Sequence, residues 1–369
     1  MSCNALYIHI PFCERKCPYC DFYSVPAREA LMEQYTDAVL RALKTQPFGI
    51  TTLDTIYFGG GTPSVLGGRR IAQLLDGISG QFTITPDAEI TVECNPHSAL
   101  ADDLKWMRQA GANRLSFGMQ SVDDAQLKLL GRLHSAADVP SAVTAAQDAG
   151  FAHISLDLML ATPHQTFADV DRAAALCDRL GVEHVSAYLL KIEEGTPFAT
   201  GNISEDCPDE DGQVALYRHA VEALGALGYQ QYEISNFARS GQVARHNLKY
   251  WNCEEYLGIG PSAHSFVDGR RRYFERDLNA FLTAEAPFSL LCDDGAGGDA
   301  EEYIMLRARL AKGIQWSALS ARYPNYDVEA LRKKALHLVD RGLVLIDDTG
   351  FRLTLDGFLL SNAVIGALI

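Results

Sequence analysis

β-rich runs and helical patterns alternate along the first half of this 369-residue chain, and no other feature limits its fold as strongly. The β-rich runs fall at 6–10, 55–58, 89–93, 114–117, 153–160 and 184–190. Helical patterns lie between them at 28–44, 69–78, 101–109, 136–148 and 167–180. Strands that alternate with helices pair in parallel through right-handed crossovers. Six such units are too few to close an eight-stranded barrel, so we predict an α/β fold with an open (β/α)6 barrel.

Glycine or polar residues follow five consecutive predicted strands. A loop with three cysteines follows the first strand, and the run Gly-Gly-Gly-Thr-Pro-Ser at 59–64 follows the second. Glu93 ends the third strand, Gln120 ends the fourth, and Asp157 lies within the fifth. Because the reactive face of an α/β barrel lies at the carboxyl ends of its strands, these residues predict a site at that end.

The three cysteines Cys13, Cys17 and Cys20 have the spacing C-x3-C-x2-C. Three thiolates can hold three irons of a [4Fe–4S] cluster and leave the fourth iron open to a small molecule. A disulfide framework suits a small secreted chain, and nine cysteines in 369 residues do not fit one. A zinc knuckle would need a second pair nearby. His9 is an alternative fourth ligand, although alternation places it in the first strand. The remaining cysteines are read as ordinary thiols: Cys3, Cys94, Cys177, Cys207, Cys253 and Cys292.

The side chains at the predicted site suit a nucleoside ligand. The glycine run permits close approach and exposes backbone amides to a carboxylate or amine, and its alternative interpretation is a tight surface turn. Glu93 could hold an amino group or a ribose hydroxyl, or be a solvated strand end. Gln120, Arg132 and Asp157 offer amide, guanidinium and carboxylate groups for a carboxylate and a ribose. Arg132 could instead pair with an acidic neighbour.

Composition narrows the class of protein. The net charge of −15 argues against a broad nucleic-acid surface, so no nucleic-acid partner is expected. The N-terminus runs directly into the first strand, which predicts no signal peptide. No apolar stretch is long enough to span a bilayer, and peripheral membrane contact stays open. Reduced thiols and an oxygen-sensitive cluster predict a cytoplasmic protein.

Six segments of the chain resemble a known family: 7–13, 59–64, 113–121, 130–134, 232–238 and 246–251. They are similar to the coproporphyrinogen III dehydrogenase/HemW group of the radical S-adenosylmethionine (SAM) superfamily, over nearly the whole chain. The resemblance implies the partial TIM-type barrel, a [4Fe–4S] cluster on three cysteines, and SAM chelated to the open iron. By the same resemblance, the SAM contacts are Tyr7, Tyr19, Gly60, Gly61, Thr62, Glu93, Gln120, Arg132 and Asp157.

The group has two branches with different activities. The dehydrogenase oxidatively decarboxylates two propionates, whereas HemW-like proteins bind heme and pass it to an acceptor protein. The dehydrogenase carries a further cysteine where this chain has Phe22, and it has a long N-terminal extension before the cysteine motif. The HNxxYW motif, here at 246–251, is characteristic of the HemW branch. The resemblance therefore implies a heme chaperone. The alternatives are coproporphyrinogen III dehydrogenation or another radical SAM reaction on a small cofactor, and enzymatic activity stays undecided.

The HNxxYW motif supplies groups that suit heme. His246 can ligate iron through a neutral imidazole, and Tyr250 and Trp251 offer flat aromatic surface. The alternative is that His246 is a hydrogen-bonded core residue. Other candidate iron ligands are Cys253, Tyr256 and His264.

Two positions depart from the pattern of relatives. Some relatives have a cysteine where Ala244 stands, so a thiolate ligand there is excluded. Relatives usually have glycine where Ala161 stands, and because alanine favours negative φ, a different local backbone is expected.

The C-terminal part reads as a separate domain. We predict a barrel domain at 1–281, an acidic, glycine-containing linker at 292–299, and a C-terminal domain at 299–369. Helical patterns at 300–311 and 328–341 precede a hairpin with strands at 343–346 and 351–354, which suggests a winged-helix-like module. The acidic surroundings favour a structural or partner-binding role over DNA binding. Related chains end in such a domain, which could cover the open side of the barrel.

Overall fold

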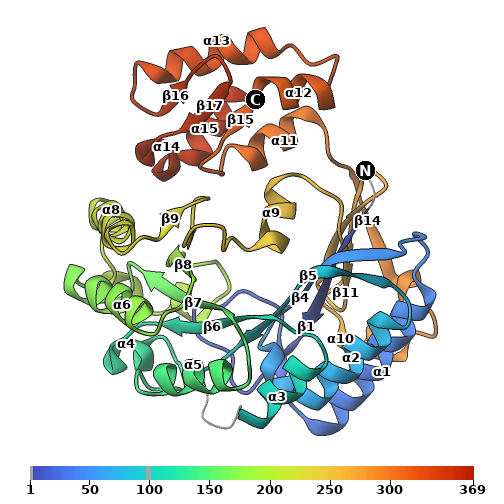
Figure 1. The fold of residues 1–369 in the computed structure, drawn as a ribbon. Helices are drawn as coiled ribbons and strands as arrows, with labels where there is room; N and C mark the ends of the chain where they lie inside the picture. Colours follow the sequence, from blue (N-terminus) through green and yellow to red (C-terminus); the bar gives the residue numbers. More distant parts are fainter. Residues whose placement is uncertain (1–2, 97–100) are drawn as a thin grey trace.

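The computed structural model describes residues 3–96 and 101–369, and within them nine strands form one sheet in the order β11-β1-β4-β5-β6-β7-β8-β10-β9 (Figure 1). Its central strands are those predicted from the sequence, and neighbours among them pair in parallel. Their bounds are β1 (Ala5–Ile10), β4 (Thr52–Gly60), β5 (Thr83–Cys94), β6 (Arg114–Gln120), β7 (His153–Leu160) and β8 (His184–Leu189). The sheet curves into the open barrel that strand–helix alternation predicts.

Helices cover the outer face of the sheet. They are α1 (Glu29–Thr45), α2 (Gly68–Ser79), α3 (Ala101–Gln109), α5 (Asp138–Asp148), α6 (Phe167–Arg179) and α8 (Glu210–Ala226). In α2 the buried residues Ile71, Leu74, Leu75 and Ile78 recur at helical spacing, so one apolar stripe faces the strands. The short helix α4 (Asp124–Leu129) escaped sequence prediction because it is less than two turns long. The side chain of Asp123 caps its first amides.

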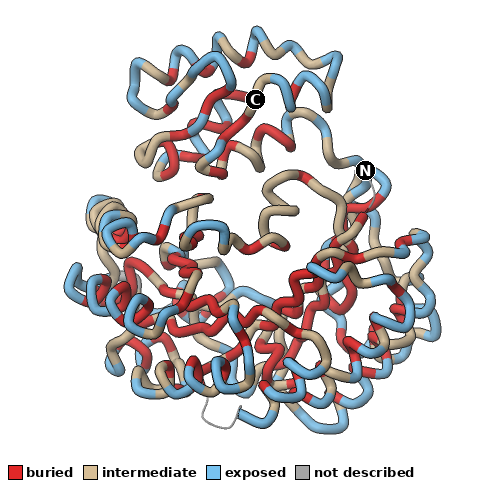
Figure 2. The backbone as a smooth tube through the Cα atoms, in the orientation of Figure 1, coloured by how far each residue is buried: buried red, intermediate tan, exposed pale blue. Residues whose placement is uncertain are grey.

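The barrel interior differs chemically from the layer between sheet and helices. Most central-strand residues are buried, as the red strands of Figure 2 show. Apolar side chains pack between strands and helices in the main hydrophobic core. Several buried strand positions instead carry small polar side chains, including Thr91, Ser116, Ser155 and Ser186. The interior is therefore suited to a polar ligand and not only to packing.

One chain segment bridges the two edges of the open sheet. At one edge, β10 (Asn236–Ala238) runs antiparallel to β8 and also pairs with β9 (Gln230–Gln231). At the other edge, β11 (Leu257–Ile259) runs parallel to β1. The segment between them contains α9 (Arg245–Trp251), which Figure 1 shows between β9 and β11. These edge strands are only two or three residues long, too short for a periodic pattern to reveal.

The predicted linker is wrong at residues 292–296. This stretch belongs to β14 (Leu291–Ala296), which pairs with β13 (Arg270–Phe274), and β13 pairs in turn with β12 (His264–Val267). Helix α10 (Leu278–Thr283) lies between β13 and β14 in the chain. The acidic, glycine-containing composition suggested a loop, but exposed charged side chains are also typical of an edge strand. Backbone pairing with β13 decides the structure there.

The C-terminal part has the element order of a winged helix. It contains α11 (Ala300–Arg307), β15 (Ile314–Gln315), α12 (Trp316–Arg322), α13 (Val328–Val339), β16 (Val344–Ile346) and β17 (Gly350–Leu353), followed by α14 (Leu355–Leu359) and α15 (Ser361–Leu368). It has its own hydrophobic cluster. The Ile234 N–H donates to the Arg309 carbonyl at 3.0 Å, and Arg218 pairs with Asp356. This part therefore packs on the turn between β9 and β10 and on α8. No helix among the described residues is long and apolar enough to cross a membrane.

Candidate functional site

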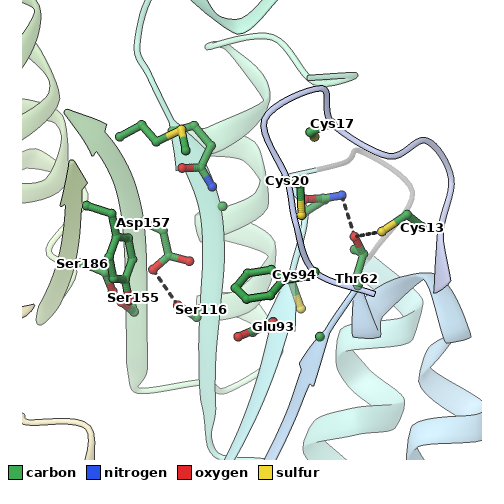
Figure 3. Close-up of a pocket in the computed structure, with 18 of the residues that line it drawn as sticks. Cys13, Cys17, Cys20, Thr62, Glu93, Cys94, Ser116, Ser155, Asp157 and Ser186 are labelled. Carbon is green, nitrogen blue, oxygen red and sulfur yellow. Dashed lines mark hydrogen bonds between the residues drawn. The ribbon is translucent and has the colours of Figure 1, made fainter. Parts of the chain in front are cut away.

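A cavity of about 530 Å³ opens at the carboxyl ends of the central strands and continues into the barrel (Figure 3). Its wall brings together residues that are far apart in the sequence. The predicted site residues that line it are Cys13, Cys17, Tyr19, Cys20, Gly60, Gly61, Thr62, Glu93, Gln120, Arg132 and Asp157. Tyr7 and His246 lie elsewhere.

The cysteine loop, residues 13–24, is closed at its base by a short parallel pairing. Here β2 (Phe12–Cys13) pairs with β3 (Val25–Pro26), and the Ala27 N–H donates to the Cys13 carbonyl at 3.0 Å. Within the loop, the Cys20 N–H donates to the Cys17 carbonyl at 3.1 Å. The loop therefore begins and ends at the same point, and its three cysteines face one cavity.

The 130–134 motif supports this loop from outside. Arg15 donates to the Gly131 carbonyl at 2.7 Å. Gly131 has φ 70°, and a Cβ there would lie 2.6 Å from Cδ of Pro18. Only glycine combines this backbone conformation with such close approach. On the other side of the loop, the Phe198 N–H, in α7 (Pro197–Thr200), donates to the Pro18 carbonyl at 3.1 Å.

Two loop sulfurs have polar neighbours from other parts of the chain. Cys13 Sγ lies 3.6 Å from Thr62 Oγ1, and Asn95 Nδ2 donates to that same hydroxyl at 3.4 Å. Arg132 donates to Cys17 Sγ at 3.7 Å. Hydrogen bonds and positive charge stabilise thiolates and tune the clusters they bind. The loop thiols therefore sit in surroundings that fit metal-bound sulfur.

The described residues contain no group of three or more His, Cys, Asp or Glu side chains arranged to hold a single metal ion. Cys94 also lines the cavity, but its thiol is buried and donates to the Val92 carbonyl at 3.8 Å. Burial raises the pKa of the Cys94 thiol, which agrees with the prediction of an ordinary thiol.

The glycine run packs against the cysteine loop. The Gly61 N–H donates to the Ile10 carbonyl and the Thr62 N–H to the Phe12 carbonyl, both at 2.8 Å. A Cβ on Gly61 would lie 2.6 Å from the Phe12 oxygen. For Gly61 and Thr62, the expectation that the amides are exposed to a ligand is therefore wrong, because carbonyls of β1 and β2 accept from them. The glycines permit close contact between strand β4 and the loop.

Two carboxyl groups face the cavity from β5 and β7, the strands on either side of β6. Tyr57 donates to Glu93 at 2.7 Å, and Ser116 donates to Asp157 at 3.0 Å. Burial raises the pKa of Glu93 to about 7, and the nearby Asp157 charge adds to this effect against the Tyr57 hydrogen bond. Burial likewise raises the pKa of Asp157 to about 6, opposed by hydrogen bonds from Ser186 and Ser116. Perturbed carboxyl groups in a polar cavity are typical of ligand sites.

Other cavity groups have unused capacity for a ligand. In the described part of the chain, Arg132 Nε and Thr91 Oγ1 are buried without a hydrogen-bond partner. Among those same residues, the Arg132 guanidinium has no acidic partner; it donates to the Gly118 carbonyl at 2.9 Å and to Asn95. Gln120 adopts φ 63°, a strained conformation for a residue other than glycine. Unpaired donors and local strain both indicate a binding site.

Tyr7 lies on β1, next to Gly59 of β4. Its hydroxyl is 3.0 Å from His9 Nδ1, and a Cβ on Gly59 would lie 3.1 Å from its ring. The other ring nitrogen of His9 is 3.0 Å from the Tyr23 carbonyl. Tyr7 and His9 therefore brace the strand and the loop. His9 has protein partners at both nitrogens, which agrees with its interpretation as a strand residue.

His246 is fully buried on α9, and both ring nitrogens have protein partners. Nδ1 lies 2.9 Å from Thr55 Oγ1, and Nε2 lies 2.8 Å from the Tyr250 hydroxyl. Its ring stacks on Tyr57 at 5.2 Å, and its backbone N–H donates to Glu89 at 2.8 Å. Burial lowers the pKa of His246 to about 3. This arrangement is that of the alternative interpretation, a hydrogen-bonded core histidine that positions α9 and Tyr57.

The other candidate iron ligands differ in access. Cys253 is buried in the C-terminal cluster. Tyr256 is half-buried beside Tyr250, with ring centroids 4.6 Å apart. The His264 side chain is exposed on β12.

Ala161 does not change the backbone as expected. It adopts φ 59°, so the expected negative φ is wrong. Gln165 holds this turn: its side chain accepts from the Ala161 N–H at 2.6 Å and donates to the Met159 carbonyl at 2.9 Å. These two hydrogen bonds offset the cost of a left-handed alanine.

Several cavity residues were not predicted. They are Tyr57, Thr91, Asn95, Arg114, Ser116, Ser155, His184 and Ser186. Arg114 and His184 are buried near the amino ends of β6 and β8, and His184 lies 2.7 Å from Ser155 Oγ. A polar residue at every second position of an otherwise apolar strand was the available signal.

Comparisons with known proteins agree with this architecture. The Radical SAM superfamily model matches residues 7–177, and the HemN C-terminal domain model matches residues 299–360. A protein named heme chaperone HemW from Mycobacterium tuberculosis is 36% identical over 99% of this chain and 94% of its own length. HemW from Bacillus subtilis is 33% identical over 99% of both chains. HemW from Escherichia coli is 39% identical over 72% of this chain and 71% of its own.

One solved structure has the same fold over the whole chain. Coproporphyrinogen III oxidase (HemN) from Escherichia coli, a radical SAM enzyme, superposes with a TM-score of 0.85 at 22% identity and covers 100% of this chain and 90% of its own. The predicted radical SAM barrel with a small C-terminal α+β domain is confirmed.

Proposed function

Because this chain belongs to the HemW group of the radical SAM superfamily, we propose that it binds heme and transfers it to an acceptor protein. The observation that carries this proposal is the full-length similarity to proteins named heme chaperone HemW, together with the convergence of the superfamily motifs on one cavity. The free state of all nine cysteines supports a reducing compartment, and we place the protein in the cytoplasm.

We assign the [4Fe–4S] cluster to Cys13, Cys17 and Cys20. These thiols are carried by a loop that is fixed at its base and faces the cavity. The hydroxyl of Thr62 and the guanidinium of Arg132 support the assignment, because they place hydrogen bonds and positive charge at the sulfurs. A cluster with three protein ligands supplies one open iron.

The rest of the cavity supplies groups for SAM. The Arg132 guanidinium suits a carboxylate, and Glu93 and Asp157 suit an amino group and ribose hydroxyls. Gln120, Tyr19, Gly60, Gly61 and Thr62 complete the wall. Tyr7 supports the glycine run through its contact with Gly59 of β4. Since burial makes the two carboxyl groups costly to ionise, a cationic ligand would stabilise them.

Heme transfer is favoured over coproporphyrinogen oxidation by Phe22. The dehydrogenase branch carries a cysteine at this position, and here the phenylalanine side chain is 68% exposed at the cavity wall. Position 22 therefore offers no thiol to a substrate in the cavity.

Two measurements on the full chain test the proposal. Titration with ferric heme should give a saturable Soret band, and heme should then move to an apo-hemoprotein mixed with the loaded chain. Anaerobic incubation of the reconstituted protein with coproporphyrinogen III and a reductant should give no vinyl product. A wild-type chain that binds no heme would refute the proposal, and vinyl product would establish the dehydrogenase instead.

A further inference from the structure

Arg132 begins a chain of hydrogen bonds that reaches two of the three loop sulfurs. Its guanidinium donates directly to Cys17 Sγ at 3.7 Å and also to Asn95 Oδ1. From there the chain continues, because Asn95 Nδ2 donates to Thr62 Oγ1 at 3.4 Å. Thr62 Oγ1 lies 3.6 Å from Cys13 Sγ, a contact that Figure 3 shows as a dashed line. One arginine is thus connected to Cys17 directly and to Cys13 through two side chains.

The chemistry of each group fixes the direction of this chain. A guanidinium can only donate, so the Asn95 atom that faces Arg132 is the amide oxygen. The Asn95 amide nitrogen then faces Thr62 and donates to its hydroxyl. Because a hydroxyl has one proton and two acceptor sites, Thr62 can accept from Asn95 and still donate its own proton. A thiolate that binds iron carries no proton, so Cys13 Sγ is the acceptor.

Asn95 and Arg132 are each anchored by a second contact. Asn95 directly follows β5, and its N–H donates to Ser64 Oγ at 3.3 Å. Ser64 is buried and lies two residues after Thr62, so two contacts join the end of β5 to the same turn. Arg132 also donates to the Gly118 carbonyl of β6 at 2.9 Å. These contacts keep the donors directed at the sulfurs.

Donors at the sulfurs affect the electron affinity of an iron–sulfur cluster. A reduced cluster carries more negative charge on its sulfurs than an oxidised one, so a hydrogen bond to a sulfur stabilises the reduced state more. The positive charge of Arg132 acts in the same direction. The chain should therefore raise the reduction potential of a cluster bound by the loop.

We propose that Asn95 is a positioning residue that aims the Thr62 hydroxyl at Cys13, and that the chain from Arg132 through Asn95 and Thr62 raises the reduction potential of the cluster. The inference rests on the cluster assignment in the proposed function. It adds a role for Asn95, and it gives Thr62 a second role beside the cavity wall.

The test is a redox titration of the reconstituted full-length chain without SAM, followed by the cluster spectrum. T62V keeps the shape of threonine and removes the donor. The ratio of reduced to oxidised cluster at a fixed potential should then fall by roughly tenfold, as expected for a lost hydrogen bond to a charged group. For a one-electron couple this is a shift of about 59 mV to lower potential. T62S keeps the hydroxyl and should titrate as wild type does. T85V is the matched control, because it removes a buried hydroxyl near the start of β5 for which the described residues offer no partner, and it should also titrate as wild type.

N95L separates positioning from a direct effect. It leaves Thr62 in place and removes the group that orients its hydroxyl, so the potential should again fall. If Asn95 acts through Thr62, N95L should cause no further fall in the T62V background. An equal fall in both backgrounds would show that Asn95 acts independently and would overturn its assignment as a positioning residue.

Two other results would contradict the proposal. One is a wild-type potential in T62V with full iron content, and the other is a T62S variant that titrates like T62V. If T62V takes up no iron, N95L decides instead, and a wild-type potential in N95L would count against the chain. A wild-type protein that takes up no cluster would refute the cluster assignment itself. Heme binding is measured separately, so a failure of the heme chaperone function is distinguishable from a failure of this inference.

Discussion

Glu93→Gln should stabilise the cofactor-free protein at alkaline pH. The Glu93 carboxyl has its pKa raised by burial from 4.5 to about 7, so the folded chain holds this proton more tightly than the unfolded chain does. Between these two pH values the folded state binds more protons, and stability therefore falls as the pH rises. The loss is complete above pH 7. A glutamine keeps the oxygen that accepts from Tyr57 and carries no charge at any pH.

The size of the effect follows from the two pKa values. A difference of one pKa unit corresponds to about 1.4 kcal/mol, so the ionised carboxylate costs about 3 kcal/mol at pH 8 as an upper bound. At pH 5 most of the Glu93 carboxyl is protonated in the folded state, and the cost is below about 1 kcal/mol. The stability advantage of Glu93→Gln over wild type should thus grow by about 2 kcal/mol from pH 5 to pH 8.

Urea unfolding of the cofactor-free chain at both pH values measures this difference. Glu33→Gln, at an exposed position on α1, is the control and should show the same advantage, if any, at both pH values. SAM binding to the reconstituted protein should weaken in Glu93→Gln by about tenfold, because a hydrogen bond to a charged group is lost. An advantage that does not change with pH would refute the claim that burial makes the ionised Glu93 carboxylate costly to stability.

Three further outcomes are expected. Replacing any of the three loop cysteines with alanine should remove most iron after anaerobic reconstitution. The control Cys177→Ala, at a buried position in α6, should keep its iron. Full iron retention in the loop variants would contradict the cluster assignment. Gly61→Ala should also reduce iron incorporation, because its Cβ would displace the loop at the Phe12 carbonyl, whereas Gly225→Ala on α8 meets no atom within 4 Å and should keep wild-type iron. His246→Ala should lower the unfolding free energy by about 3 kcal/mol, because it leaves a cavity and two hydroxyls without a partner. The heme spectrum should stay unchanged. A changed Soret band would show that His246 ligates the heme iron.

The sequence was sufficient for the central strands because each carries its own signal. β7 was predicted at its observed bounds, since polar and apolar residues alternate through most of 153–160, next to a clear helical pattern. The edge strands β9, β10 and β11 gave no such signal, because they are held by pairing with distant strands. The same cause explains β14, where acidic residues sit on an edge strand and resemble a linker.

The candidate site could be predicted from sequence where the role of a residue follows from its own motif or its place at a strand end. Cys13, Gly61 and Asp157 were placed correctly on the cavity wall from spacing and strand ends alone. His246 shows the limit of this reasoning, because its role depends on Thr55 and Tyr250, and a motif does not state which partner a ring nitrogen has. Tertiary hydrogen bonds decide between a ligand and a core residue.

The cysteine loop contacts the candidate cavity on one side and the residues that follow β13 on the other. Its thiols line the cavity, while Asp21 pairs with Arg276, which follows β13. The Tyr23 hydroxyl accepts from the Leu278 N–H at 3.1 Å, where α10 begins. A cluster bound by the three thiols would restrict the loop, and these contacts would carry that order to the residues after β13.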